Sequence, residues 1–121
     1  MNKRFSILSF KFASEGLLAA LKEEPNLKFQ FLAGLIVILI SIFLKISTKD
    51  WETIIILIGL VIAVELTNTA IEAVVDKFVE NQHPGAKLAK DISAAAVLVA
   101  SLTAAIVGVI IFSPYLFRWT I

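Results

Sequence analysis

Carboxylate and amide side chains recur at helical spacing within residues 65–76, a stretch that is otherwise mostly Ile, Leu, Val, Ala and Thr. They are Glu65, Asn68, Glu72 and Asp76. At about 100° per residue, these positions share a sector of about 80° on one face of a helix. An acid in an apolar helix is costly unless it faces a protein interior or a wet cavity. We therefore expect the chemistry of this protein to lie on this face.

Phosphoryl transfer is one reaction that this face could serve. It needs a group that orients the attacking hydroxyl, acids that hold Mg²⁺ and a cation that compensates phosphate charge. Mg²⁺ favours carboxylate oxygens together with substrate phosphates, so Glu72 and Glu24 are candidate ligands if their segments meet. Glu65 lies about 10 Å from Glu72 along a helix, where it could meet a lipid hydroxyl while ATP is held above it. Lys90, beside Asp91, could place a positive charge on a phosphate.

Two other functions fit the same residues. A buried polar seam can fix helix register or subunit packing, and acids within a membrane also mark ion or proton paths. The pair Lys90-Asp91 alone is typical of an anchor at the lipid headgroups, and a single loop histidine such as His83 is typically solvated. The residues alone therefore leave three functions open: phosphoryl transfer, ion translocation by a small helix bundle, and a purely structural role.

The composition favours an integral membrane protein. Of the 121 residues, 59% are hydrophobic, and they gather in long blocks instead of being spread through amphipathic elements. The net charge of +1 does not indicate a nucleic-acid partner, and the lack of cysteine excludes disulfides. Because three short spans make a thin bundle in which to bury charges, we expect a homo-oligomer.

The hydrophobic blocks predict an all-α membrane protein with a single domain over residues 1–121. An amphipathic helix over residues 1–24 is expected to lie on the membrane surface, because basic and large apolar side chains alternate there. The expected transmembrane helices cover residues 27–46, 51–79 and 91–113. The third is expected to end at Pro114.

Positive charge predicts the orientation of these spans. Lys and Arg are concentrated before residue 29 and between residues 77 and 90, and they are sparse elsewhere. By the positive-inside rule, we expect a multi-pass membrane protein with a cytoplasmic N-terminus. One set of polar side chains then gathers on the cytoplasmic side, where ATP is found: Glu24, Asp76, His83, Lys90 and Asp91.

Several blocks of the sequence resemble the small prokaryotic diacylglycerol kinase family. The signature blocks are ELTNTAIEAVVD, from Glu65, and KDISAAAVL, from Lys90; the N-terminal blocks are SFKFA, from Ser9, and EPNLK, from Glu24. The resemblance covers about residues 4–112 in the family's order and spacing. It implies an integral lipid kinase of the bacterial inner (cytoplasmic) membrane and a homotrimer with active sites shared between subunits. It also implies a lipid alcohol as substrate, and Mg²⁺ and ATP as cofactor and donor.

The resemblance also implies roles for single residues. Glu65 matches the family's catalytic carboxylate, and Glu24 and Glu72 match its metal and nucleotide ligands. The other residues implied to shape the nucleotide and phosphate site are Asn68, Asn81, Gln82, His83, Lys90 and Asp91. Asp76 and Phe12 are expected to support the site, although Phe12 stands where a tyrosine is usual.

The lipid is the least determined part of this assignment. Family members with Ala in place of a Ser in the third-helix block tend to prefer undecaprenol, and Ala94 stands at that position. Ala94 and the sequence Asn68-Thr69-Ala70 therefore favour undecaprenol over diacylglycerol. Lys28 and Gln30 depart from the family's usual residues, which leaves the lipid and adenine contacts open.

Overall fold

The computed structural model describes residues 3–80 and 83–120, and nearly all of them are helical. Within these ranges the helices are α1 (Lys3–Glu23), α2 (Pro25–Leu44), α3 (Thr48–Phe78) and α4 (Pro84–Thr120). The last three are long and apolar enough to cross a membrane. The prediction of an all-α membrane protein, with an N-terminal helix before three spans, is confirmed.

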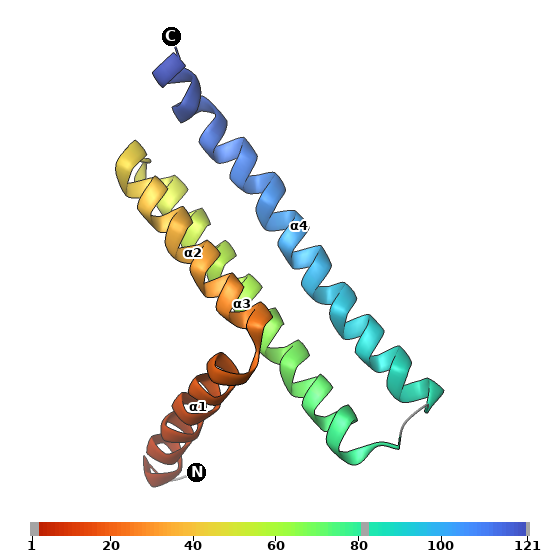
Figure 1. The fold of residues 1–121 in the computed structure, drawn as a ribbon. Coiled ribbons are helices and arrows are strands. Elements are labelled where there is room, and N and C mark those ends of the chain that lie inside the picture. The colour runs from red at the N-terminus through yellow and green to blue at the C-terminus, as the bar shows by residue number, and fades with distance from the viewer. Residues whose placement is uncertain (1–2, 81–82, 121) are drawn as a thin grey trace.

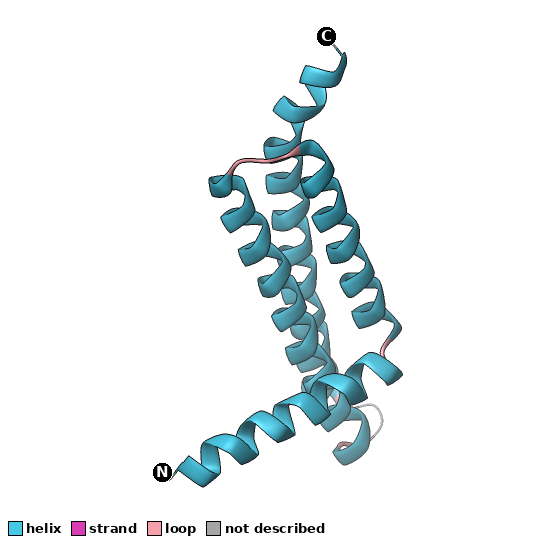
Figure 2. Ribbon diagram, turned by 90° about the vertical axis from the view of Figure 1, so that its left-hand side faces the viewer, coloured by secondary structure: helices cyan, strands magenta, loops and turns pink. Residues whose placement is uncertain are grey.

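The spans form a bundle, and α1 lies across one end of it (Figure 1). This is the end at which the chain passes from α3 to α4, as Figure 2 shows from the side. Helix α3 makes its most extensive contacts with α4 and smaller ones with α2, and α1 contacts both α2 and α3. The first helix and the α3–α4 connection therefore lie on the same side of the three spans.

Local chemistry explains where the first helices begin and end. Glu24 alone separates α1 from α2; its backbone is extended, with φ −108°, and Pro25 takes the first position of α2. The helical conformation is disfavoured for the residue that precedes a proline, whereas proline itself suits the first turn of a helix. At the other end of α2, Lys45 adopts a left-handed conformation, with φ 54°. Ser47 then caps α3, because its hydroxyl accepts a hydrogen bond from the Asp50 N–H at 3.2 Å.

Helix α4 does not end at Pro114, where the sequence predicts that the third span ends. A proline removes a backbone donor and crowds the preceding turn, but tertiary contacts hold the helix beyond it. The Tyr115 hydroxyl donates a hydrogen bond to Asp50 Oδ2 at 2.6 Å and accepts one from the Ser47 N–H at 2.9 Å. These bonds attach the last turns of α4 to the start of α3.

The apolar core is small and lies near the α2–α3 connection. Its buried members are Leu44, Ile46, Ile54 and Ile111. Most other large apolar side chains are exposed in the single chain, including Phe43, Ile56 and Val109. Side chains of this kind face lipid or other subunits in a membrane protein, and the predicted site residues lie toward the opposite end of the bundle.

Candidate active site

Glu65 is buried between the helices although its side chain is an acid. It is 2% exposed and lies within the predicted span of α3. The carboxylates of Glu72, two turns later on α3, and Glu24, at the α1–α2 junction, lie close enough to act on its charge. The structure therefore places two other predicted site residues within electrostatic reach of Glu65, and one of them, Glu24, comes from a different element. Glu72 and Glu24 are only partly buried.

A chain of hydrogen bonds connects this acidic group to α4. The Ser93 hydroxyl donates to Asn68 Oδ1 at 2.6 Å, and Asn68 Nδ2 donates to Glu72 Oε1 at 3.2 Å. Asn68 is thus placed beside Glu72, within the predicted site.

Ser93 is not among the residues that the sequence predicts for the site. The one signal in the sequence was a hydroxyl at the start of an alanine-rich block, which does not by itself indicate a partner on another helix.

The predicted phosphate-binding residues lie at the end of the bundle where α3 passes to α4. Lys90 Nζ is 2.8 Å from Asp76 Oδ1, so this pair joins the two helices. Lys87 Nζ is 2.6 Å from Asp91 Oδ2, one turn later on α4. These four side chains and His83 line an open cavity of about 360 Å³. Glu80 adds a third carboxylate to the lining. Because both ammonium groups are already paired with carboxylates, they can bind an anionic ligand only by exchanging partners with it.

His83 caps α4. Its Nδ1 accepts hydrogen bonds from the N–H groups of Gly85 and Ala86, at 3.1 and 3.2 Å. Asn81 and Gln82, predicted to belong to the nucleotide site, lie outside the described residues. Phe12 lies on α1, and its side chain is 61% exposed.

The donor set fits a metal that is shared with a substrate. Among the described residues, no three Asp, Glu or His side chains form a group that could hold a metal ion by themselves. Mg²⁺ is usually bound by one or two carboxylates together with water and substrate phosphates. Glu72 and Glu24, which are partly exposed and within electrostatic reach of the buried Glu65, suit this kind of site. A closed cage of protein ligands, as in structural zinc sites, does not fit them.

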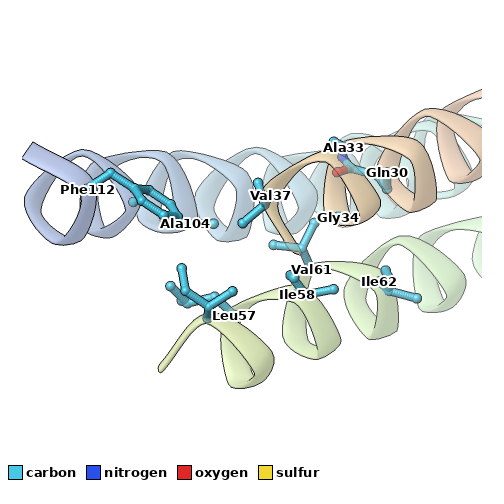
Figure 3. A pocket seen from close by; sticks show the side chains of 12 residues that line it. Gln30, Ala33, Gly34, Val37, Leu57, Ile58, Val61, Ile62, Ala104 and Phe112 are labelled. Atoms are coloured by element: carbon cyan, nitrogen blue, oxygen red, sulfur yellow. The ribbon is translucent and has the colours of Figure 1, made fainter. Parts of the chain in front are cut away.

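An apolar cavity of about 130 Å³ lies between α2, α3 and α4 (Figure 3). On α3 its lining begins with Ile62 and Val61, one turn before Glu65, and continues to Ile54 near the other end of the helix. Gln30 contributes a polar side chain from α2, and Phe112 lies on the α4 side. The space can therefore take a hydrocarbon group close to the buried carboxylate.

Comparison with known proteins decides the family. The model of the prokaryotic diacylglycerol kinase family matches residues 11–112. The chain belongs to this family. The match includes the acidic face of α3, the Glu24 junction and the first part of α4, and it confirms the resemblance seen in the sequence.

Curated relatives agree with this assignment. An undecaprenol kinase from Bacillus subtilis (strain 168) is 38% identical over 108 residues, which are 89% of this chain and 88% of the relative. A diacylglycerol kinase from Synechocystis sp. is 35% identical over 109 residues, 89% of this chain and 62% of the relative. A diacylglycerol kinase from Escherichia coli (strain K12) is 35% identical over 95 residues, 78% of each chain.

Family membership confirms the prediction of a lipid kinase, a phosphotransferase with an alcohol as acceptor. Its helices and its relatives also make this chain a multi-pass bacterial membrane protein.

Proposed function

We propose that this member of the diacylglycerol kinase family transfers the γ-phosphoryl group of ATP to a membrane lipid alcohol, with Mg²⁺ as cofactor. The observation that carries the proposal is the buried carboxylate of Glu65, with two further carboxylates, those of Glu24 and Glu72, within electrostatic reach of it. The hydroxyl of a lipid in the bilayer can approach Glu65 from within the membrane. A nucleotide can approach the two more exposed acids from the aqueous side.

Each residue has a role that follows from its position. Glu65 orients the lipid hydroxyl and accepts its proton as the oxygen attacks the γ-phosphorus. The bond from the γ-phosphorus to the β–γ bridging oxygen breaks and ADP leaves, and burial of the site excludes competing water. Glu72 and Glu24 would hold Mg²⁺, which when bound neutralises charge on the β- and γ-phosphates. Lys90 exchanges its bond with Asp76 for one with phosphate. Asn68 holds Glu72, and Asp91 and the loop around His83 border the nucleotide.

Undecaprenol is the acceptor that we favour. The Bacillus subtilis relative carries that name, and Ala94 stands where undecaprenol-type members of the family tend to have alanine. The apolar cavity beside Glu65 gives the first part of a hydrocarbon chain a place between the helices. Diacylglycerol is the second candidate, because the Synechocystis and Escherichia coli relatives are named for it.

We also propose that three copies assemble with their active sites between subunits in the cytoplasmic membrane, with the N-terminus in the cytoplasm. The large exposed apolar surface of the chain supports an oligomer. The excess of Lys and Arg in the N-terminal segment and in residues 77–90 supports the orientation.

The test is transfer of labelled γ-phosphate from Mg·ATP to undecaprenol and diacylglycerol, side by side in detergent micelles. We expect faster labelling of undecaprenol.

Glu65→Gln should lower kcat at least a hundredfold, because a positioned base contributes a factor of about 10²–10⁴ to the rate. Its elution volume and its binding of a non-hydrolysable ATP analogue should match the wild type. An assembled Glu65→Gln protein with full activity would remove Glu65 from the mechanism, and no labelling of either lipid by folded wild-type oligomer would refute the proposed function.

A further inference from the structure

We propose that Ser93 is a positioning residue of the active site: from α4 it sets the orientation of the Asn68 amide and, through that amide, of the Glu72 carboxylate. This inference rests on the proposed function, in which Glu72 is a metal ligand. In this role Ser93 acts through its hydrogen bond to Asn68 and not by contact with metal or substrate.

The contacts form a continuous path between two helices. Ser93 and Asn68 are 25 residues apart in the chain, and the bond between them is buried. Both side chains are well enclosed, at 7% and 6% exposure. Asn68 and Glu72 are i and i+4 neighbours on α3 and share one face of it. Asn68 is therefore bonded on one side to a hydroxyl from α4 and on the other to the proposed ligand.

The charge of Glu72 decides which way the Asn68 amide faces. An ionised carboxylate accepts hydrogen bonds and cannot donate one, so the amide must turn its NH₂ group toward Glu72. Its carbonyl oxygen then points away, toward α4, where it needs a donor because a buried polar atom without a partner destabilises the fold. Ser93 supplies that donor. The opposite orientation would place the amide oxygen against the carboxylate oxygen.

Removal of the Ser93 hydroxyl would release this arrangement. The Asn68 oxygen would lack its donor at that site, and the amide would gain by rotating toward another partner. Hydrogen bonds in a chain also polarise one another, so losing the first bond weakens the second. Glu72 would then sample more rotamers. Because metal binding would have to restrict these rotamers, the site would bind its metal more weakly.

A structural role alone predicts a different result. If Ser93 only joins α3 to α4, its loss lowers thermal stability but leaves the metal affinity of the assembled protein unchanged. Ser101 offers a matched control on the same helix, because its buried hydroxyl has no hydrogen-bond partner among the described residues. Ser101→Ala removes the same atom from α4 without touching Asn68.

The experiment measures Mn²⁺ binding by electron paramagnetic resonance, with a non-hydrolysable ATP analogue, for the full-length protein in detergent micelles. We expect Ser93→Ala to weaken Mn²⁺ binding about tenfold, as is common when a partner of a metal ligand is removed. Ser101→Ala should bind as the wild type does. The Mg²⁺ concentration that half-saturates kinase activity should rise in parallel for Ser93→Ala, with kcat at saturating Mg²⁺ little changed.

Equal Mn²⁺ affinity in Ser93→Ala and Ser101→Ala would overturn the inference and leave the proposed function standing. A wild-type protein that transfers no phosphate and binds no Mn²⁺ would overturn both. If Ser93→Ala does not assemble, Ser93→Cys replaces it, since a thiol has similar size but is a weaker donor. Weakened Mn²⁺ binding by an assembled Ser93→Cys protein would support the inference, and wild-type binding would contradict it.

Discussion

Lys87 and Lys90 lie one turn apart near the start of α4, and their ion pairs differ in whether they join two helices. Lys87 pairs with Asp91 on its own helix, where both side chains are well exposed. Lys90 pairs with Asp76 on α3 and is the less exposed of the two lysines. Its ammonium also lies within the field of Glu72. Of the two, Lys90 is therefore the one held over the acidic face of α3, where the phosphates of a nucleotide would lie.

We predict that Lys90→Ala raises KM for ATP about tenfold or more, because a hydrogen bond to a charged group is lost. Asp76 would lose its partner as well, but its exposed carboxylate remains hydrated, so assembly should not change. The measurement is initial rate against ATP concentration at saturating lipid and Mg²⁺. Lys77→Ala is the control, since Lys77 is an exposed cation in the last turn of α3. Equal KM values for the two variants would remove Lys90 from the nucleotide site.

At the scale of the elements, the contact between α2 and α3 depends on the absence of a side chain at Gly34. A Cβ atom built there would lie 3.2 Å from Ile58 Cγ2 on α3. Ile58 is β-branched, so it has few alternative rotamers in a helix, and the helices would have to move apart. The same position borders the apolar cavity. Close approach of α2 to α3 therefore shapes the space that we assign to the lipid chain.

Gly34→Ala should lower the free energy of unfolding by about 1 kcal/mol, because crowding a packed contact outweighs the gain in helix propensity. Gly108→Ala is the matched control: it also faces the cavity, but its Cβ would meet nothing within 4 Å. That control should be neutral or slightly stabilising. Thermal or SDS-induced unfolding in detergent gives both values. A Gly34→Ala protein as stable as Gly108→Ala would show that α2 and α3 are more loosely packed than described.

At the scale of the whole molecule, a single chain leaves most of its apolar surface uncovered. Of the most apolar stretch of 18 residues in α4, only 6% is buried by the rest of the chain. The small core lies near the α2–α3 connection, whereas the acidic group lies toward the opposite end. The apolar cluster therefore does not extend to the site end, and neighbouring copies could both cover that end and add residues to it.

If the sites are shared between subunits, variants with different defects should complement each other. We predict that Glu65→Gln protein and Lys90→Ala protein, each poorly active alone at an ATP concentration well below the KM of Lys90→Ala, regain activity at that concentration when they are dissociated together and allowed to reassemble. Some interfaces then combine an intact Glu65 from one copy with an intact Lys90 from another. Each variant reassembled alone is the control. No recovery from mixed oligomers that mass photometry shows to have formed would place both residues of each site in one chain.

Much of the fold and part of the site could be predicted from the sequence, because they depend on local geometry. Apolar blocks of sufficient length predict the spans, and helical spacing places Glu65, Asn68 and Glu72 on one face whatever packs against it. The breaks near Pro25 and Pro84 follow from the conformational limits of proline. Pro114 misleads the same reasoning, since contacts of Tyr115 with the start of α3 hold the helix beyond it.

By itself, the sequence determined the family, the all-α membrane class and the residue types available for phosphoryl transfer. Only the tertiary structure decided which of them meet. Glu24 approaches Glu65 because α1 turns into α2 beside α3, and Ser93 bonds Asn68 because α4 packs along α3. A contact between distant segments depends on how each helix is rotated about its axis and how far it is shifted along its neighbour. The pattern of residue types along the chain does not specify these two quantities for each pair of helices.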